Sequence, residues 1–307
     1  MPVLVGTSGW NYPSGRGTWN GLFYPLPRPR GFDELSYYAE RFETVEVNST
    51  FYRSPEAAVV SAWLRRTPSS FLFSVKLFQK FTHPDMYLAR PGVTDWDVTR
   101  GDLDAFRIGI EPLAASGRLA ALLLQFPPSF HAGPDTRGYL DWLASALEGY
   151  PLAVELRHRS WSEDANATKV LLDAHRAAWV WIDEPKFATS IRQPSSDLAV
   201  TSSGGLAYMR LHGRNAEQWW QHEQAEDRYD YLYSASELAP LAEAATAAAG
   251  TGRRVLMYFN NHFSAKAVAN AVVLRRQLGD LVPGDYPPEI VARYPELTGL
   301  VRTTGLF

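Results

Sequence analysis

Pro151-Leu152-Ala153-Val154-Glu155-Leu156-Arg157-His158-Arg159-Ser160-Trp161 begins with four apolar residues and ends in charged ones. Successive side chains of a β-strand point to opposite faces, so Ala153, Glu155 and Arg157 share one face. A carboxylate and a guanidinium on the inner face of an apolar strand must be paired or must serve a ligand, because unpaired buried charge is costly. The stretch therefore predicts either an internal ion pair or a charged pocket at the end of a buried strand.

Similar apolar runs recur along the chain and alternate with segments of helical periodicity. Eight strands are predicted, at residues 3–5, 43–48, 71–76, 119–125, in the opening stretch of 151–161, and at 178–183, 206–212 and 254–260. Helices are predicted at 33–42, 57–66, 102–116, 136–147, 164–176, 236–249 and 264–278, the last beginning at a Ser264 cap. Residues 77–100 have no clear pattern and are predicted to be irregular.

This alternation predicts an α/β protein, specifically a (β/α)8 TIM barrel formed by residues 1–282 as a single domain. The connections after the strands are longer than those after the helices, as expected when function lies at the carboxyl ends of the strands. Residues 283–307 form a Pro-rich tail that is expected to have little core character and to pack on the barrel or extend from it.

Nearly every predicted strand ends in polar residues that lie on one face. The pairs two residues apart are Glu46 with Asn48, Ser74 with Lys76, Glu155 with Arg157, and Arg210 with His212, while Gln125, Asp183 and Asn260 end other strands. Charge at the ends of apolar strands is costly unless a cleft or a ligand receives it. We therefore predict a binding or catalytic site at these ends, with a purely structural salt-bridge network as the alternative.

The residue types suggest a division of roles at this site. Lys76, Arg157 and Arg210 would bind an anion such as phosphate or carboxylate. Glu155 or Glu46 would act as base and His212 as acid, with Asp183 competing for the role of base. Other polar groups would orient the substrate, and aromatic residues of the first long loop would stack on a base or sugar or form a hydrophobic plug. These further substrate-binding candidates are Asn48, His83, Gln125, Asp183, Asn260, Asn261 and His262, with the aromatic residues Trp10, Tyr12 and Tyr24.

Composition excludes several other chemistries. The chain has no cysteine, which removes disulfides, thiol nucleophiles, iron–sulfur clusters and thiolate zinc sites. Three histidines and three carboxylates among the candidates could supply ligands for zinc or manganese. However, the chain has no HExxH motif, and the interleaved cations would repel a metal, so no metal site and no cofactor are predicted. P-loop, GxGxxG and GxSxG motifs are also absent.

The totals point away from charged polymers and membranes. A net charge of −3 over 307 residues gives no global field toward nucleic acid or membrane, so any basic patch must be local. The first residues, Met-Pro-Val-Leu-Val-Gly, lack the features of a signal peptide. A cytoplasmic protein without membrane contact is expected, and the sequence gives no indication of its oligomeric state.

The chain resembles the DUF72 family, also called YecE-like, in ordered blocks within residues 3–275. The matching blocks are Gly6-Thr7-Ser8-Gly9-Trp10, Phe23-Tyr24-Pro25, Thr44-Val45-Glu46-Val47-Asn48-Ser49-Thr50-Phe51-Tyr52, Phe73-Ser74-Val75-Lys76, Thr82-His83, Leu123-Leu124-Gln125-Phe126-Pro127-Pro128, Val154-Glu155-Leu156-Arg157-His158, Ser160-Trp161, Arg210-Leu211-His212-Gly213, Tyr258-Phe259-Asn260-Asn261-His262 and Ala269-Asn270-Ala271. The resemblance implies a TIM barrel similar to the xylose isomerase-like and endonuclease IV-like group. It implies no assigned activity, and nucleic-acid binding is suggested only by analogy of fold.

Taken together, these observations predict an enzyme, with a phosphoester hydrolase or a related hydrolase as the leading class. Its partner would be an anionic small molecule or nucleic acid, with a nucleotide or nucleic acid as the leading substrate. Three alternatives stay open: a non-catalytic nucleic-acid or ligand-binding barrel, a metal-dependent hydrolase or isomerase, and a carbohydrate-active enzyme with paired carboxylates beside aromatic residues.

Overall fold

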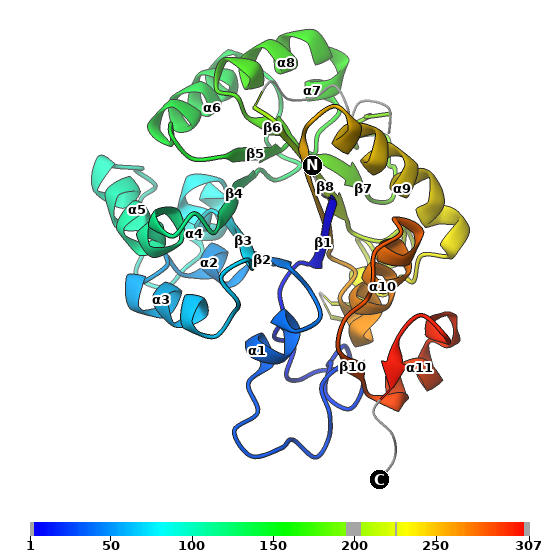
Figure 1. The fold of residues 1–307 in the computed structure, drawn as a ribbon. Helices are drawn as coiled ribbons and strands as arrows, with labels where there is room; N and C mark the ends of the chain where they lie inside the picture. The colour runs from blue at the N-terminus through cyan, green and yellow to red at the C-terminus, as the bar shows by residue number, and fades with distance from the viewer. Residues whose placement is uncertain (1–2, 195–203, 225, 304–307) are drawn as a thin grey trace. The chain divides into compact units, whose positions relative to one another are not determined.

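Parallel strands and helices alternate through the part of the chain that the computed structural model describes, residues 3–194, 204–224 and 226–303 (Figure 1). The chain divides into two compact units. The first unit comprises Met1–Val45, Ile182–Pro185 and Met209–Phe307, and the second comprises Glu46–Trp181 and Lys186–Tyr208. The prediction of an α/β protein is confirmed.

One sheet has four strands in the order β1-β9-β8-β7. Their bounds are Val3–Thr7 for β1, Arg254–Phe259 for β9, Leu206–Leu211 for β8 and Trp181–Asp183 for β7. β1 and β9 run parallel, with Val3 opposite Val255 and Thr7 opposite Phe259. Both strands are apolar and almost entirely buried, as is typical of parallel sheets covered on both faces.

A second sheet has five strands in the order β2-β3-β4-β5-β6. Their bounds are Thr44–Val47, Leu72–Lys76, Leu119–Gln125, Leu152–Glu155 and Ala178–Trp179. All seven residues of β4 are buried. The parallel register places Gln125 of β4 opposite Glu155 of β5, so the two polar strand ends lie at the same level.

Helices connect most of the strands. They are α1 Glu34–Ala39, α2 Ser49–Tyr52, α3 Ala57–Arg65, α4 Pro84–Leu88, α5 Arg100–Ala115, α6 Pro134–Ala146, α7 Ser160–Glu163, α8 Ala165–Ala174, α9 Ala235–Gly250, α10 Lys266–Gln277 and α11 Pro288–Arg293. α5 begins at a capping box, in which Thr99 and Asp102 each bind the other's backbone N–H. No helix in the described ranges is long and apolar enough to cross a lipid bilayer.

Two predicted elements differ from the structure. The predicted strand 178–183 is two strands, β6 and β7, separated at Val180. The predicted Ser264 cap is wrong, because Ser264 has a φ of 51° and α10 begins after Ala265 without a side-chain cap. Ser264 instead binds the first long loop, donating its backbone N–H to the carbonyl of Gly17 at 3.0 Å. A long-range contact thus overrides the local capping preference.

The irregular segment and the tail are also more ordered than expected. Residues 77–100 include a short 3-10 helix, Gln79–Phe81, and α4. In the tail, β10 (Asp285–Tyr286) pairs in parallel with β11 (Arg302–Thr303). The expectation of little core character is wrong, because the tail buries the side chains of Tyr286, Ile290, Tyr294 and Leu297.

Helices α3 and α5 of the second unit pack side by side (Figure 1). Gly109 of α5 lies against the chain just before α3, where an added Cβ would lie 2.1 Å from the carbonyl oxygen of Pro55. We expect Gly109→Ala to lower the free energy of unfolding by about 1–3 kcal/mol, because the backbone must move to admit the methyl group. Urea denaturation followed by circular dichroism measures this change.

Gly138 in α6 provides a matched control, because a Cβ there would meet nothing within 4 Å. We expect Gly138→Ala to stabilise the protein by about 0.4–1 kcal/mol through the lower backbone entropy of the unfolded chain. Equal stabilities for the two variants would contradict the close packing of α5.

Candidate functional site

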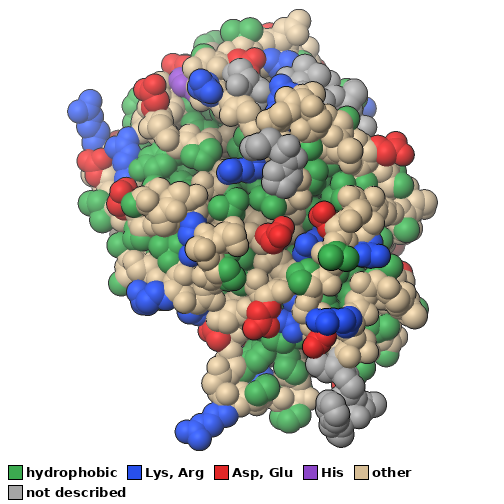
Figure 2. Space-filling view, in the orientation of Figure 1, with side chains coloured by type: hydrophobic (Ala, Val, Ile, Leu, Met, Phe, Trp, Pro, Cys, Tyr) green, Lys and Arg blue, Asp and Glu red, His purple; other side chains and the backbone are tan. Residues whose placement is uncertain are grey.

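The described surface shows no broad area of one charge on the face in Figure 2, where Lys and Arg side chains lie among Asp and Glu. This mixture agrees with the net charge of −3. A protein that binds nucleic acid mainly through phosphates would need a continuous basic surface. Specific chemistry on this chain is therefore expected from local groups at the strand ends.

One such group lies in the second unit at the carboxyl ends of β3, β4 and β5. We call it the strand-end cluster, and it consists of Lys76, His83, Gln125, Glu155 and Arg157. Glu155 is the fully buried last residue of β5, and its Oε1 accepts a 2.6 Å bond from Nε of Arg157. The Arg157 side chain is 16% exposed, so this ion pair lies almost out of solvent. The internal ion pair, one of the two alternatives that the sequence leaves open, is therefore present.

Lys76 lies at the end of β3, above an aromatic ring. Its Nζ is 3.9 Å from the centroid of the Phe51 ring, a cation–π contact. The hydroxyl of Thr50 donates a 2.6 Å bond to the Lys76 carbonyl and ties the start of α2 to β3. Nearby in sequence, Asn48 is half-buried, and its Oδ1 has no hydrogen-bond partner in the described part of the chain. Asn48 therefore keeps an acceptor that a ligand or water can use.

His83 is buried and held at both ring nitrogens. Gln125 Nε2 donates to Nε2 of His83 at 3.3 Å and also to the Phe126 carbonyl, which orients the Gln125 amide. The proton of the neutral imidazole then lies on Nδ1, 2.8 Å from the Thr82 hydroxyl oxygen. His83 thus acts as a neutral hydrogen-bonding group.

The pKa of His83 is lowered from its ordinary value of 6.5 to about 3, chiefly because the ring is buried. The positive charges of Lys76 and Arg157 contribute to this lowering, and the charge of Glu155 opposes it. Two cations and one carboxylate therefore act electrostatically on the same histidine. At neutral pH His83 carries no charge and cannot supply a proton.

Glu46, the other carboxylate predicted as a base, lies in β2 and is fully buried. The hydroxyl of Tyr208 in the second unit donates a 2.7 Å bond to its Oε2. Sequence analysis did not select Tyr208, although its place two residues before Arg210 puts it in phase with that polar strand end.

In the first unit, the predicted residues after β8 and β9 come together around His212. The imidazole is fully buried, with Nδ1 2.9 Å from Asn260 Nδ2 and Nε2 3.4 Å from Arg210 Nη1. Nε2 can accept this bond only when it carries no proton. Asn261 is different, because its amide donates to the Tyr231 carbonyl and to Asn270 Oδ1 and so binds the polypeptide itself.

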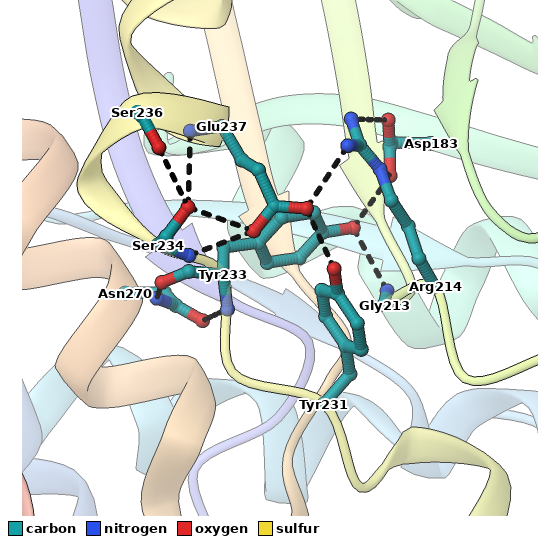
Figure 3. A network of polar contacts seen from close by, with 9 residues as sticks. All are labelled: Asp183, Gly213, Arg214, Tyr231, Tyr233, Ser234, Ser236, Glu237 and Asn270. Atoms are coloured by element: carbon teal, nitrogen blue, oxygen red, sulfur yellow. Dashed lines mark hydrogen bonds and ion pairs between the residues drawn. The ribbon is translucent and has the colours of Figure 1, made fainter.

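Asp183 belongs to a separate polar network in the first unit (Figure 3). Its two oxygens accept bonds from Nε and Nη2 of Arg214, at 2.9 and 2.8 Å, and a third bond from the Tyr233 hydroxyl at 2.8 Å. The hydrogen bond to Asp183 is the main cause that raises the pKa of Arg214 above its ordinary value. Because both Asp183 oxygens are engaged, a structural role is favoured over the role of base.

Sequence analysis missed Arg214, Tyr233 and the neighbouring Glu237 in this network. Glu237 accepts a 3.1 Å bond from Arg214, and Tyr233 accepts a 2.9 Å bond from the backbone N–H of Gly213. These partners come from an irregular segment and a helix start. No periodic pattern marks them, so only the folded chain identifies them as partners of Asp183.

The three aromatic candidates occupy different environments in the first unit. Tyr24 is fully buried and donates a hydrogen bond to the carbonyl of Trp10, which itself is half-buried. Tyr24 has no exposed ring to stack on a ligand and belongs to the hydrophobic plug. Tyr12 is half-buried and stacks on His262, with the ring centroids 4.3 Å apart.

His262 and Ser8 contribute further polar atoms to this region. Burial lowers the pKa of His262 to about 4, and its Nδ1 is buried without a hydrogen-bond partner among the described residues. The hydroxyl oxygen of Ser8, the residue that follows β1, is also buried without a hydrogen-bond partner among the described residues. Across the described ranges, no three His, Asp or Glu side chains are placed to hold a metal ion.

These features define an α/β protein of parallel sheets with polar residues at the carboxyl ends of its strands. Residues 4–290 match the family described as a protein of unknown function, DUF72. The chain belongs to the DUF72 family.

The similar proteins agree with this assignment. The UPF0759 protein YunF of Bacillus subtilis is 27% identical over 290 residues, which cover 92% of this chain and 96% of YunF. A solved DUF72 protein from Thermotoga maritima is 33% identical, with a TM-score of 0.73. The match covers 91% of this chain and 100% of the Thermotoga chain. Another, from Enterococcus faecalis, is 23% identical with a TM-score of 0.75 and coverages of 91% and 96%, and it shows likeness of fold.

Because the pKa of His83 is lowered in the folded protein, the free energy of unfolding is expected to depend on pH. A folded-state pKa of about 3, against 6.5 in the unfolded chain, means that the unfolded state binds more protons between these values. Stability is therefore full above pH 6.5 and falls as the pH drops, by up to about 1.4 kcal/mol per pH unit. In urea titrations at pH 7, 6 and 5, we expect His83→Gln to lose less stability than the wild type.

His222, a surface-loop histidine, is the control, and His222→Gln should keep the wild-type slope. If His83→Gln shows the same slope as well, His83 is not the group that responds to pH.

Proposed function

We propose that this DUF72 protein is an enzyme that binds a phosphate-bearing substrate at the strand-end cluster and uses Glu155 for acid–base chemistry. The observation that supports this most is the electrostatic environment of His83. Lys76 and Arg157 both lower its pKa, while Glu155 raises it, so the charges of two cations and a buried carboxylate act on one imidazole. An anion that binds beside His83 would be attracted by both cations.

The residues have complementary chemistry for such a substrate. Lys76 offers a compact charge, and the planar guanidinium of Arg157 can bind two phosphate oxygens. Glu155 lies 2.6 Å from Arg157 Nε, so an anion on Arg157 would be held beside the carboxylate. A carboxylate in that place can accept a proton from an attacking water during phosphoester hydrolysis. Neutral His83 would keep Gln125 and Thr82 in place without adding charge.

A nucleotide or other small phosphate ester is the leading substrate within this proposal. The net charge of −3 and the intermixed charges on the face drawn in Figure 2 favour a small ligand over a long nucleic acid, whose binding depends on many basic contacts. In the first unit, anion binding by Arg210 and proton donation by His212 stay predictions of the same kind. A non-catalytic ligand-binding protein is the alternative, and turnover separates it from an enzyme.

We also propose that the eight-strand pattern closes into a (β/α)8 barrel. The parallel pairing within each sheet and the helices between the strands support this architecture. A crystal structure checks it, and an unpaired edge strand in either sheet would argue against closure.

Substitutions in the strand-end cluster test the proposed activity. We expect Lys76→Met to weaken binding of adenosine monophosphate at least about tenfold, because one of two anion-binding charges is lost. We expect Glu155→Gln to keep binding and to lower turnover of phosphate monoesters by about a hundredfold or more, because the amide cannot accept the proton. Calorimetry measures the binding, and release of inorganic phosphate measures the turnover.

Lys169→Met on helix α8 is the matched control and should change neither quantity. Full turnover in a folded Glu155→Gln variant would remove the catalytic role. If the wild type and Lys76→Met bind adenosine monophosphate with equal affinity, the proposed anion site is refuted. If the wild type binds the ligand but shows no turnover, the non-catalytic alternative is favoured.

A further inference from the structure

An aromatic cavity lies in the second unit next to the strand-end cluster. Its volume is about 300 Å³, and its surface is almost entirely apolar. Five aromatic side chains line it: Phe81, Trp96, Phe126, Phe130 and Tyr139. Small-molecule pockets are typically apolar cavities of roughly 300–1,000 Å³ with few polar groups, so this one is large enough for a planar ring system.

The polar atoms of the two amphipathic rings are already bonded to the polypeptide. Trp96 Nε1 donates a 2.6 Å bond to the carbonyl of Lys80, and the Tyr139 hydroxyl donates a 2.8 Å bond to the carbonyl of Phe81. These bonds fix both rings and leave only apolar ring surface for a ligand. The walls are therefore preorganised for stacking against a flat, apolar partner.

The two threonine hydroxyls of the lining are also engaged within the protein. Thr82 Oγ1 lies 2.8 Å from His83 Nδ1, and Thr136 Oγ1 donates a 2.7 Å bond to the carbonyl of His131. Each threonine hydroxyl of the cavity therefore already has a hydrogen-bond partner within the protein. A sugar ring, which requires several hydrogen-bonding partners, fits such a lining poorly.

Asp135 is the exception among the polar groups of the cavity. It lies in the first turn of α6, is exposed, and its side chain makes no hydrogen bond or ion pair with any described residue. Its carboxylate can accept hydrogen bonds but repels an anion. The ligand group at the rim must therefore be a hydrogen-bond donor or a cation.

The position of the cavity relates it to the strand-end cluster. Thr82 directly precedes His83 and binds its ring, and Phe126 directly follows Gln125 and accepts a bond from its side chain through its carbonyl. The same two backbone segments thus form one wall of the cavity and hold two members of the cluster.

We propose that this cavity binds a planar aromatic ring bearing an amino group, with the ring against Trp96 and Tyr139 and the amino group on Asp135. Its link to the phosphate site rests on the proposed function, in which the substrate carries the ring and the phosphate on one molecule. An amino-substituted nucleotide such as adenosine monophosphate has both features. The cavity then selects the base, and the cluster binds the phosphate.

Calorimetry with adenosine, which has the ring but no phosphate, tests the cavity alone. We expect Trp96→Leu to weaken adenosine binding about tenfold, since stacking of one base is worth roughly 1–3 kcal/mol. We expect the wild type to prefer adenosine over purine riboside, which lacks the amino group and has no N–H on its ring, and Asp135→Leu to abolish that preference, because leucine has no acceptor. Trp220→Leu, at an exposed tryptophan of the first unit, is the control and should bind as the wild type does.

Lys76→Met separates the ring site from the phosphate site. It should leave adenosine binding unchanged and weaken only the binding of adenosine monophosphate. If adenosine does not bind, or binds Trp96→Leu as well as the wild type, the ring site is refuted while phosphate binding is judged separately with inorganic phosphate. If adenosine binds as expected but its monophosphate binds no better, the ring site stands and the phosphate site fails.

Discussion

Burial of the Glu155 carboxylate at the end of an apolar strand is the constraint on which the strand-end chemistry depends. A lone charge there would cost several kcal/mol, and the bond from Arg157 offsets that cost. The parallel register then places Gln125 at the same level, and Gln125 in turn orients His83. The ion pair of Glu155 and the hydrogen bond of Gln125 to His83 thus lie at the ends of neighbouring strands.

Other strand ends satisfy the same physical requirement with partners from elsewhere. Glu46 receives a hydroxyl from Tyr208, and Asp183 receives both the guanidinium of Arg214 and the hydroxyl of Tyr233. Such bonds divide the carboxylates into two kinds. Asp183 is held by an extensive network that stabilises the fold (Figure 3), whereas Glu155 is paired with a cation that an incoming anion can share.

The proposed chemistry of the second unit separates charge from apolar surface. The strand-end cluster concentrates two cations around a neutral histidine, and the neighbouring aromatic cavity has its polar groups bonded inward. A ligand with one anionic end and one flat end would satisfy both environments at once. The carboxylate of Asp135 at the cavity rim would orient such a ligand, because it favours a hydrogen-bond donor there and disfavours a second anion.

The sequence by itself determined the α/β class, most strands and helices, and the polar strand ends, because periodic patterns record which face of an element is buried. It also placed Glu155 and Arg157 on one face of a strand, with an ion pair as one of two alternatives. Only the tertiary structure decided the partners of Asp183, the burial of Tyr286 and the cavity around Trp96. Those contacts join residues from irregular segments far apart in the chain, and no local period encodes which of them will meet.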